Sequence, residues 1–140
     1  MSYEKRKKSS KKNCLPPFSP IFFQEMDSAA FMALPGSAAK ALPYFKRIHG
    51  RLIKKFGDDY NGIFDFTYTE AAECGFARRT FSRIIAELNA KGFIDIVKQG
   101  GKRGCGMSNS KYCMSERWRD YGKRGFMTRA RYPSEPPSLG

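Results

Sequence analysis

The stretch from Thr69 to Ile94 constrains the fold of this 140-residue chain more than any other part of it. Residues 69–74 are typical of a short helix, and Gly75-Phe76-Ala77 of a three-residue turn. A longer helix follows, with apolar residues at three- and four-residue steps, and it ends at Lys91-Gly92. A short turn containing Gly between two helices predicts a helix-turn-helix, whose second helix enters a DNA major groove.

The second of these helices is expected to have two chemically different faces. Its inward face, together with the aromatic residues just before and after the helix, is expected to consist of Phe76, Phe81, Ile84, Ile85, Leu88 and Phe93. The face left outward near its N-terminal half carries Arg78, Arg79, Ser82 and Arg83. A recognition helix contacts bases with its N-terminal residues, and arginine pairs well with the guanine edge. The alternative is a basic face that is merely solvated.

The segments on either side of the two helices predict a small sheet. Alternating apolar residues predict a strand at 64–68, after which Thr69 is expected to cap the next helix without a capping box. A second strand is expected at 93–97, then a glycine-rich loop from Gly100 to Ser110, and a returning strand from Lys111 to Trp118. The predicted fold is α+β and mainly helical: a winged helix-turn-helix with a three-helix core, a small antiparallel sheet and a wing hairpin.

Upstream, two further helices are expected. Asp27-Ser28 predicts the cap of a short helix over 29–32, and Ser37 the cap of a long helix reaching Phe56. An apolar stripe runs along the long helix to Phe56, and Pro43 is expected to kink this helix or to delay its start. His49 is expected on its solvent-facing side.

Charge is concentrated at the two ends of the chain. Lys and Arg outnumber Asp and Glu by 26 to 13, yet residues 13–97 carry a net charge of only +1. We therefore expect a basic, disordered arm at 1–20, a folded domain at 21–121 and a basic, Pro-rich tail at 122–140. This distribution indicates a polyanionic partner, with nucleic acid as the first candidate and an anionic membrane surface as the second.

Composition argues against several other classes of protein. The chain has no apolar run of about 18 residues and no secretory leader, so a cytoplasmic, nucleoid-associated protein without a membrane partner is expected. One histidine and four cysteines without a C-x-x-C pair predict no metal site, no cofactor and no catalytic residues. Cys105 and Cys113 could face each other across a hairpin, but free thiols are expected in a reducing compartment.

The pattern G-F-A-x-x-T-F-x-x-x-I-x-x-L-x-x-x-G-F-I, from Gly75 to Ile94, resembles that of bacterial winged helix-turn-helix proteins. Residues 28–34, 68–71 and 110–115 extend the resemblance, which covers roughly residues 28–118. Together they are similar to small winged-helix proteins encoded on plasmids, phages and integrated elements. That resemblance implies double-stranded DNA binding in regulation or in replication. Initiators of this kind often carry a second domain, for which this chain has no room.

Contacts with DNA are expected from the second helix, from the turn before it and from the hairpin. Residues of the second helix and the turn before it would read bases, and basic residues of the hairpin would contact phosphate or the minor groove. The residues expected to contact DNA are Thr69, Ala77, Arg78, Arg79, Thr80, Ser82, Arg83, Lys102, Arg103 and Lys111. A protein-interaction module and a non-specific nucleic-acid binder, of RNA included, are the alternatives. A homodimer formed through the Phe18–Phe31 segment also stays open.

Overall fold

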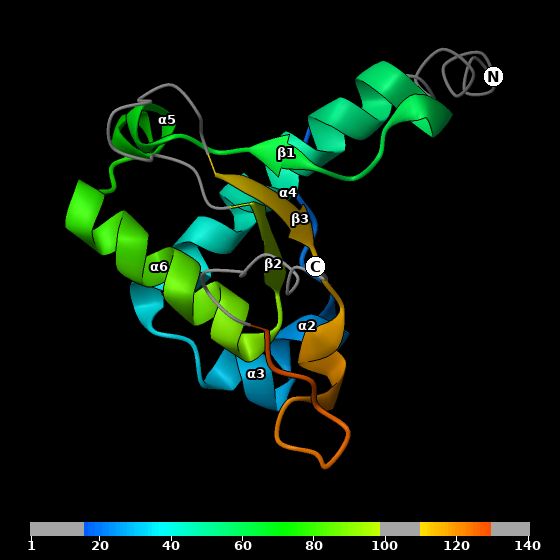
Figure 1. Cartoon of the computed structure of the whole chain (residues 1–140), viewed down its shortest axis with the longest axis vertical. Helices are drawn as coiled ribbons and strands as arrows, with labels where there is room; N and C mark the ends of the chain where they lie inside the picture. Colours follow the sequence, from blue (N-terminus) through cyan, green and yellow to red (C-terminus); the bar gives the residue numbers. More distant parts are fainter. Residues whose placement is uncertain (1–15, 99–109, 130–140) are drawn as a thin grey trace, which may run out of the picture.

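The computed structural model describes residues 16–98 and 110–129, which form an α+β fold (Figure 1). Its α-helices are α2 (Phe23–Met26), α3 (Ala29–Met32), α4 (Gly36–Phe56), α5 (Tyr68–Glu73) and α6 (Arg78–Lys91). Its strands are β1 (Phe64–Asp65), β2 (Ile94–Lys98) and β3 (Lys111–Met114), and its 3-10 helices are η1 (Gly57–Asp59) and η2 (Arg117–Asp120). The α+β class and the small antiparallel sheet expected from the sequence are therefore present.

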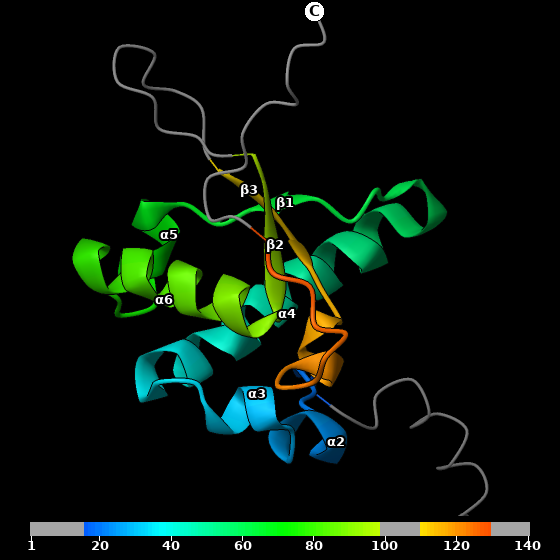
Figure 2. The ribbon, with the colours of Figure 1, turned by 60° about the horizontal axis from the view of Figure 1, so that its bottom comes forward.

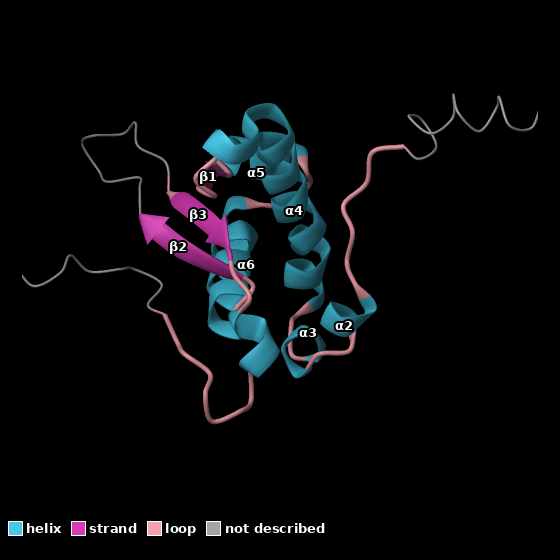
Figure 3. Ribbon diagram, turned by 90° about the vertical axis from the view of Figure 1, so that its right-hand side faces the viewer, coloured by secondary structure: helices cyan, strands magenta, loops and turns pink. Residues whose placement is uncertain are grey.

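Helix α4 runs through the middle of the molecule. Helix α6 and the paired strands β2 and β3 lie on one side of it, and residues 16–22 lie on the other (Figures 1 and 3). The short helices α2 and α3 gather at one end of the molecule, and β1 lies toward the opposite end (Figure 2). This arrangement leaves the outer face of α6 and the outer face of α4 pointing in different directions.

The core is centred on Phe45 of α4, which is fully buried. Its ring contacts rings from the first and last strands, from α6 and from the segment before α5. The centroid distances are 6.1 Å to Phe64, 4.9 Å to Phe66, 6.3 Å to Phe81 and 5.7 Å to Tyr112. Such aromatic pairs add to the burial of apolar area, so one residue of α4 fixes both α6 and the sheet.

The three strands are ordered β1-β3-β2, and both pairings are antiparallel. In the β2–β3 ladder Ile96 pairs with Tyr112, and the register then shifts so that Lys98 pairs with Lys111. The extra residue of this bulge changes the alternation of side chains. Ile96 is buried, whereas Val97 and Lys98 after it are both exposed. Strand β2 therefore leaves the core at Ile96.

Helix α4 ends at Phe56 as the sequence predicts and departs from the prediction at its start. It begins at Gly36 with Pro35 as its N-cap, one residue before the expected cap at Ser37. Pro43 lies inside the helix and does not delay its start. Buried residues flank Pro43 on both sides, and their packing offsets the helix bond that proline cannot make. The expected apolar stripe reaches solvent at Ile53 and Phe56, because the last turns extend past the rest of the core (Figure 1).

The segment before α4 contacts the rest of the domain through polar groups, while two of its aromatic side chains lie in solvent. Ser28 caps α3 as predicted, and its Oγ accepts a hydrogen bond from the Phe31 N–H at 3.1 Å. Glu25 is buried and pairs with Lys46 of α4 at 2.7 Å. The side chains of Phe18 and Phe23, by contrast, are 67% and 82% exposed.

The start of α5 corrects the prediction around Thr69. Strand β1 ends at Asp65 instead of Tyr68, and the N-cap of α5 is Thr67, so Thr69 lies within the first turn. Thr67 Oγ1 accepts from the Glu70 N–H at 3.0 Å, and Glu70 Oε1 accepts from the Thr67 N–H at 2.8 Å. This is a capping box, and the expectation that none would form was wrong. The threonine three residues before Glu70 satisfies two backbone donors at once, which Thr69 is too close to do.

The predicted returning strand is also shorter than expected, because β3 ends at Met114 and η2 follows. Arg117 of η2 turns inward and uses its guanidinium to join several segments. It donates to Asp95 Oδ1 at 2.9 Å through Nε, to the Met127 carbonyl at 2.8 Å through Nη1, and to the Ile94 carbonyl at 3.1 Å through Nη2. Nη2 also donates to Asn89 of α6. Residues of the C-terminal segment as far as Arg129, whose carbonyl accepts from Asn89, thus contact the domain.

His49 is half-buried on α4, and the expectation that it would lie at the surface was wrong. Its Nδ1 lies 3.3 Å from the Tyr60 hydroxyl, and its ring lies against Phe64. Burial, and secondarily the positive charge of Lys46, lowers the pKa of His49 below its ordinary value of 6.5.

We predict that this lowered pKa makes the fold less stable in weak acid. Above pH 6.5 the histidine is neutral in both states, so its contribution to the free energy of unfolding is constant. As the pH falls below 6.5, the unfolded chain takes up a proton that the folded chain resists, and that free energy decreases. Because His49 is the only histidine, an NMR titration of its ring protons reports this group alone. A midpoint at or above 6.5 would contradict the burial described here.

Candidate nucleic-acid interface

The connection between α5 and α6 is fixed by backbone geometry. Gly75 has a φ of +93°, a conformation that side chains with a Cβ rarely adopt. The N–H groups of Gly75 and Phe76 donate to the Ala72 and Ala71 carbonyls at 3.0 Å and 2.9 Å. Phe76 is 5% exposed and closes the core beside Tyr44. The short turn predicted from Gly75-Phe76-Ala77 is therefore present, and it sets the direction in which α6 leaves.

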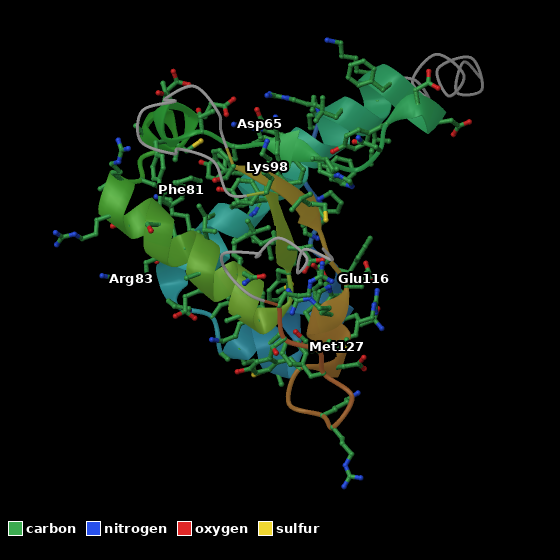
Figure 4. The ribbon with its side chains drawn as sticks, in the orientation of Figure 1. Asp65, Phe81, Arg83, Lys98, Glu116 and Met127 are labelled. Carbon is green, nitrogen blue, oxygen red and sulfur yellow. The ribbon has the colours of Figure 1, made fainter. Side chains whose placement is uncertain are left out.

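Helix α6 has the two faces that its sequence predicts. Its buried residues include Phe81, Ile84, Ile85 and Leu88, all of which were expected inside. Arg79 and Arg83 are exposed, and they have no hydrogen-bonding or charged partner within residues 16–98 and 110–129. Figure 4 shows Arg83 on the outer side of α6. The helix therefore presents two unneutralised guanidinium groups to solvent.

The N-terminus of α6 carries its own positive character. Its N-cap is Ala77, whose side chain cannot accept from the first backbone N–H groups, and its first turn holds no acidic residue. The free N–H groups and the helix dipole both favour an anion at this end. Ala77 is exposed, and Thr80 and Ser82 are half-buried along the edge of the arginine face.

Tyr68 is a residue of this surface that sequence reasoning did not single out. The Arg78 guanidinium lies over the Tyr68 ring, 4.5 Å from its centroid. A cation–π contact of this kind is worth about 0.5–1 kcal/mol at an exposed site. It restrains Arg78 against α5, whereas Arg79 and Arg83 keep their full reach. Thr69 follows Tyr68 and is exposed, but the hydrogen bonds, ion pairs and ring contacts of the described residues do not link it to these arginines.

The basic residues predicted for the hairpin have different outcomes. Lys102 and Arg103 lie outside the described residues, as does Cys105. Lys111 is at the start of β3, and its Nζ pairs with Asp65 Oδ1 of β1 at 2.7 Å. A neighbouring strand therefore supplies a carboxylate that partly neutralises Lys111, while its side chain remains 41% exposed, and the predicted phosphate contact at Lys111 stays a prediction.

Lys98 is a more available cation than Lys111 at this end of the sheet. It is exposed at the end of β2, directly opposite Lys111 in the ladder. In the sequence Lys98 is one of many basic residues between positions 98 and 131, and nothing there distinguishes it from Lys111 as a phosphate contact. Cross-strand pairing is the information that distinguishes the two lysines.

Other kinds of site find little support among the residues that the structure describes. Within these ranges no group of three or more His, Cys, Asp or Glu side chains could hold a metal ion. Cys74 and Cys113 are free thiols, and burial, with the nearby Asp95 carboxylate, raises the pKa of Cys113. None of the helices in the described part of the chain has the length and apolar character needed to cross a membrane.

A comparison with models of known protein families found no match, and neither did searches of curated proteins and of solved structures. Function is therefore inferred from the exposed arginines of α6, the helix end beside them and the neighbouring β2–β3 strands.

Proposed function

We propose that this chain binds double-stranded DNA sequence-specifically through α6, as a winged helix whose wing is formed by β2, β3 and the segment between them. The observation that carries the proposal is the pair Arg79 and Arg83: both are exposed, unpaired among the described residues, and on the N-terminal half of a helix whose other face is core. Guanidinium groups in this position reach base edges in the major groove.

Two further observations support the same polymer. The strands β2 and β3 lie on the same side of α4 as α6 (Figure 3), and Lys98 at the end of β2 provides a cation for the phosphate backbone. The folded centre is almost neutral while the whole chain carries +13, so long-range attraction to a polyanion comes mainly from the ends. We infer that the protein acts on the nucleoid, as a regulator of transcription or as a replication accessory protein of a mobile element.

We predict that Arg79→Ala weakens binding to the best site by about 1–3 kcal/mol and relaxes the base preference at one position. The reason is that a bidentate arginine–guanine contact discriminates between bases, and alanine cannot replace it. Selection of bound sequences from a random duplex library would first define the site. Fluorescence anisotropy with that duplex and with single-base variants of it then measures both effects.

Two control variants separate base reading from simple charge. Arg119→Ala also removes an arginine, but one on η2 that already pairs with Glu116, and it should leave affinity and base preference unchanged. Lys102→Ala, in the segment between β2 and β3, should weaken binding evenly across sequences. The assignment of α6 would fail if Arg79→Ala changed neither affinity nor base preference.

A further inference from the structure

A groove lies on the outer side of α4, away from α6 and the sheet. Residues 16–20 run alongside α4 and form one wall, and Lys46, Arg47, Arg51 and Lys54 contribute to the other. The space between the two walls measures about 810 Å³ and is open to solvent. Figure 3 shows residues 16–22 and α6 on opposite sides of α4. This groove is therefore separate from the surface proposed above to read duplex DNA.

The groove is basic, and none of the described residues that line it is acidic. Lys46 is neutralised by the buried Glu25, and Arg47 lies over the Tyr44 ring, 5.1 Å from its centroid. Arg51 and Lys54 are exposed and have no partner among the described residues. They lie three residues apart on one helix, so they share a face and can contact neighbouring groups of one ligand. The ligand favoured by this charge is an anion with more than one charged group.

The opposite wall adds an aromatic ring to these cations. Phe18 lines the groove and is 67% exposed, so most of its ring is free for contact. Its neighbours Pro16, Pro17 and Pro20 have restricted φ angles, which reduces the entropy lost when this wall is ordered by a ligand. Single-strand binding sites combine cations that contact the phosphate backbone with an aromatic ring on which a base can stack.

A single strand fits this combination better than a duplex does. Bases in a duplex are stacked on one another and offer no free face to Phe18, whereas an unpaired base does. We propose that the groove binds a short stretch of single-stranded nucleic acid, with Arg51 and Lys54 on its phosphates and Phe18 stacked on a base. Because α6 lies on the other side of α4, one molecule can hold a duplex and an unpaired strand at the same time.

The experiment measures binding of the full chain to fluorescent oligo-dT and oligo-rU by anisotropy. Phe18→Ala removes the stacking surface and changes no charge, and it should weaken single-strand binding by at least about fivefold. Phe23→Ala is the matched control, since Phe23 is 82% exposed and does not line the groove, and it should have no effect. Weaker binding of Phe18→Ala to either oligomer supports the proposal, and weaker binding to only one of them shows which polymer the groove prefers.

The charged wall is tested with the double variant Arg51→Ala, Lys54→Ala. It should weaken single-strand binding. It should also make the negative slope of log affinity against log salt concentration shallower by about 1.4, as expected for two lost phosphate contacts. Duplex affinity should stay within about twofold of that of the unchanged chain, since α6 is intact. Circular dichroism and urea denaturation confirm that each variant is folded.

The outcomes for the groove and for α6 are separable. Arg79→Ala should weaken duplex binding and leave single-strand binding unchanged, so either site can fail without the other. Unchanged single-strand binding by Phe18→Ala would overturn the groove proposal. An equal loss of duplex and single-strand binding by the double variant would overturn it too, because the wall would then act only as general charge.

Discussion

Arg117→Met is expected to lower the free energy of unfolding by up to about 3–5 kcal/mol, the cost of removing one partner of a buried ion pair, because its pair with Asp95 is largely buried. Methionine replaces the unbranched part of the side chain as far as Nε but leaves Asp95, whose side chain is only 15% exposed, without its cation. The carbonyls of Ile94 and Met127 lose donors in the same step. Urea denaturation followed by circular dichroism at neutral pH measures the change.

Arg119 provides the control, because it lies two residues along the same 3-10 helix and also pairs with a carboxylate. Its partner Glu116 is 72% exposed, so Arg119→Met should cost less than about 1 kcal/mol. Replacing both Arg117 and Asp95 by apolar residues should cost less than the sum of the single changes. Equal losses for Arg117→Met and Arg119→Met would show that the inward guanidinium contributes no more than a surface pair.

Gly92→Ala is the second change with a large expected effect. Gly92 ends α6 with a φ of +90°, where a side chain costs about 1–2 kcal/mol. A Cβ built there would lie 2.6 Å from the Trp118 backbone nitrogen and 2.8 Å from the Arg117 carbonyl carbon. Backbone cannot move aside as a flexible side chain can, so overpacking adds about 1–3 kcal/mol. The same urea denaturation should show a total loss of about 2–5 kcal/mol.

Gly75→Ala separates the two contributions. Gly75 has nearly the same φ of +93°, but a Cβ added to it would meet none of the described residues within 4 Å. This variant should show only the conformational cost of about 1–2 kcal/mol. The difference between the two losses in free energy of unfolding is then the cost of fitting a Cβ atom between the end of α6 and η2. If both variants lost the same amount, η2 would be free to move away from the end of α6.

The part of the fold that the sequence predicts best is the part fixed by local signals. Gly75 marks the turn before α6, and Gly92 marks the end of α6. The spacing of the apolar residues from Phe81 to Leu88 is consistent with a single buried face of that helix. The exposure of Arg79 and Arg83 follows from that face. Each of these inferences needs only residues within a few positions of one another, which is why it could be made without a structure.

The features that the sequence did not reveal depend on contacts between distant residues. Lys111 reads as one more hairpin lysine until Asp65, 46 residues away, is brought beside it. Arg117 reads as part of a basic stretch, and only the fold turns it inward to Asp95 and Asn89. The cap at Thr67 was missed for another reason: the alternation of Phe64, Phe66 and Tyr68 continues past the end of the strand, so periodicity alone placed the boundary too late.

The bulge between Ile96 and Lys98 bears on how this protein could be altered. Beyond Ile96 the described residues of the strand contribute no buried side chain, so residues added after Lys98 should displace none of the described core. Doubling the number of residues between two fixed chain ends costs only about 0.6 kcal/mol of closure entropy. A peptide tag or a reporter inserted there should be carried by the folded domain, and natural variation in length should be tolerated at the same place.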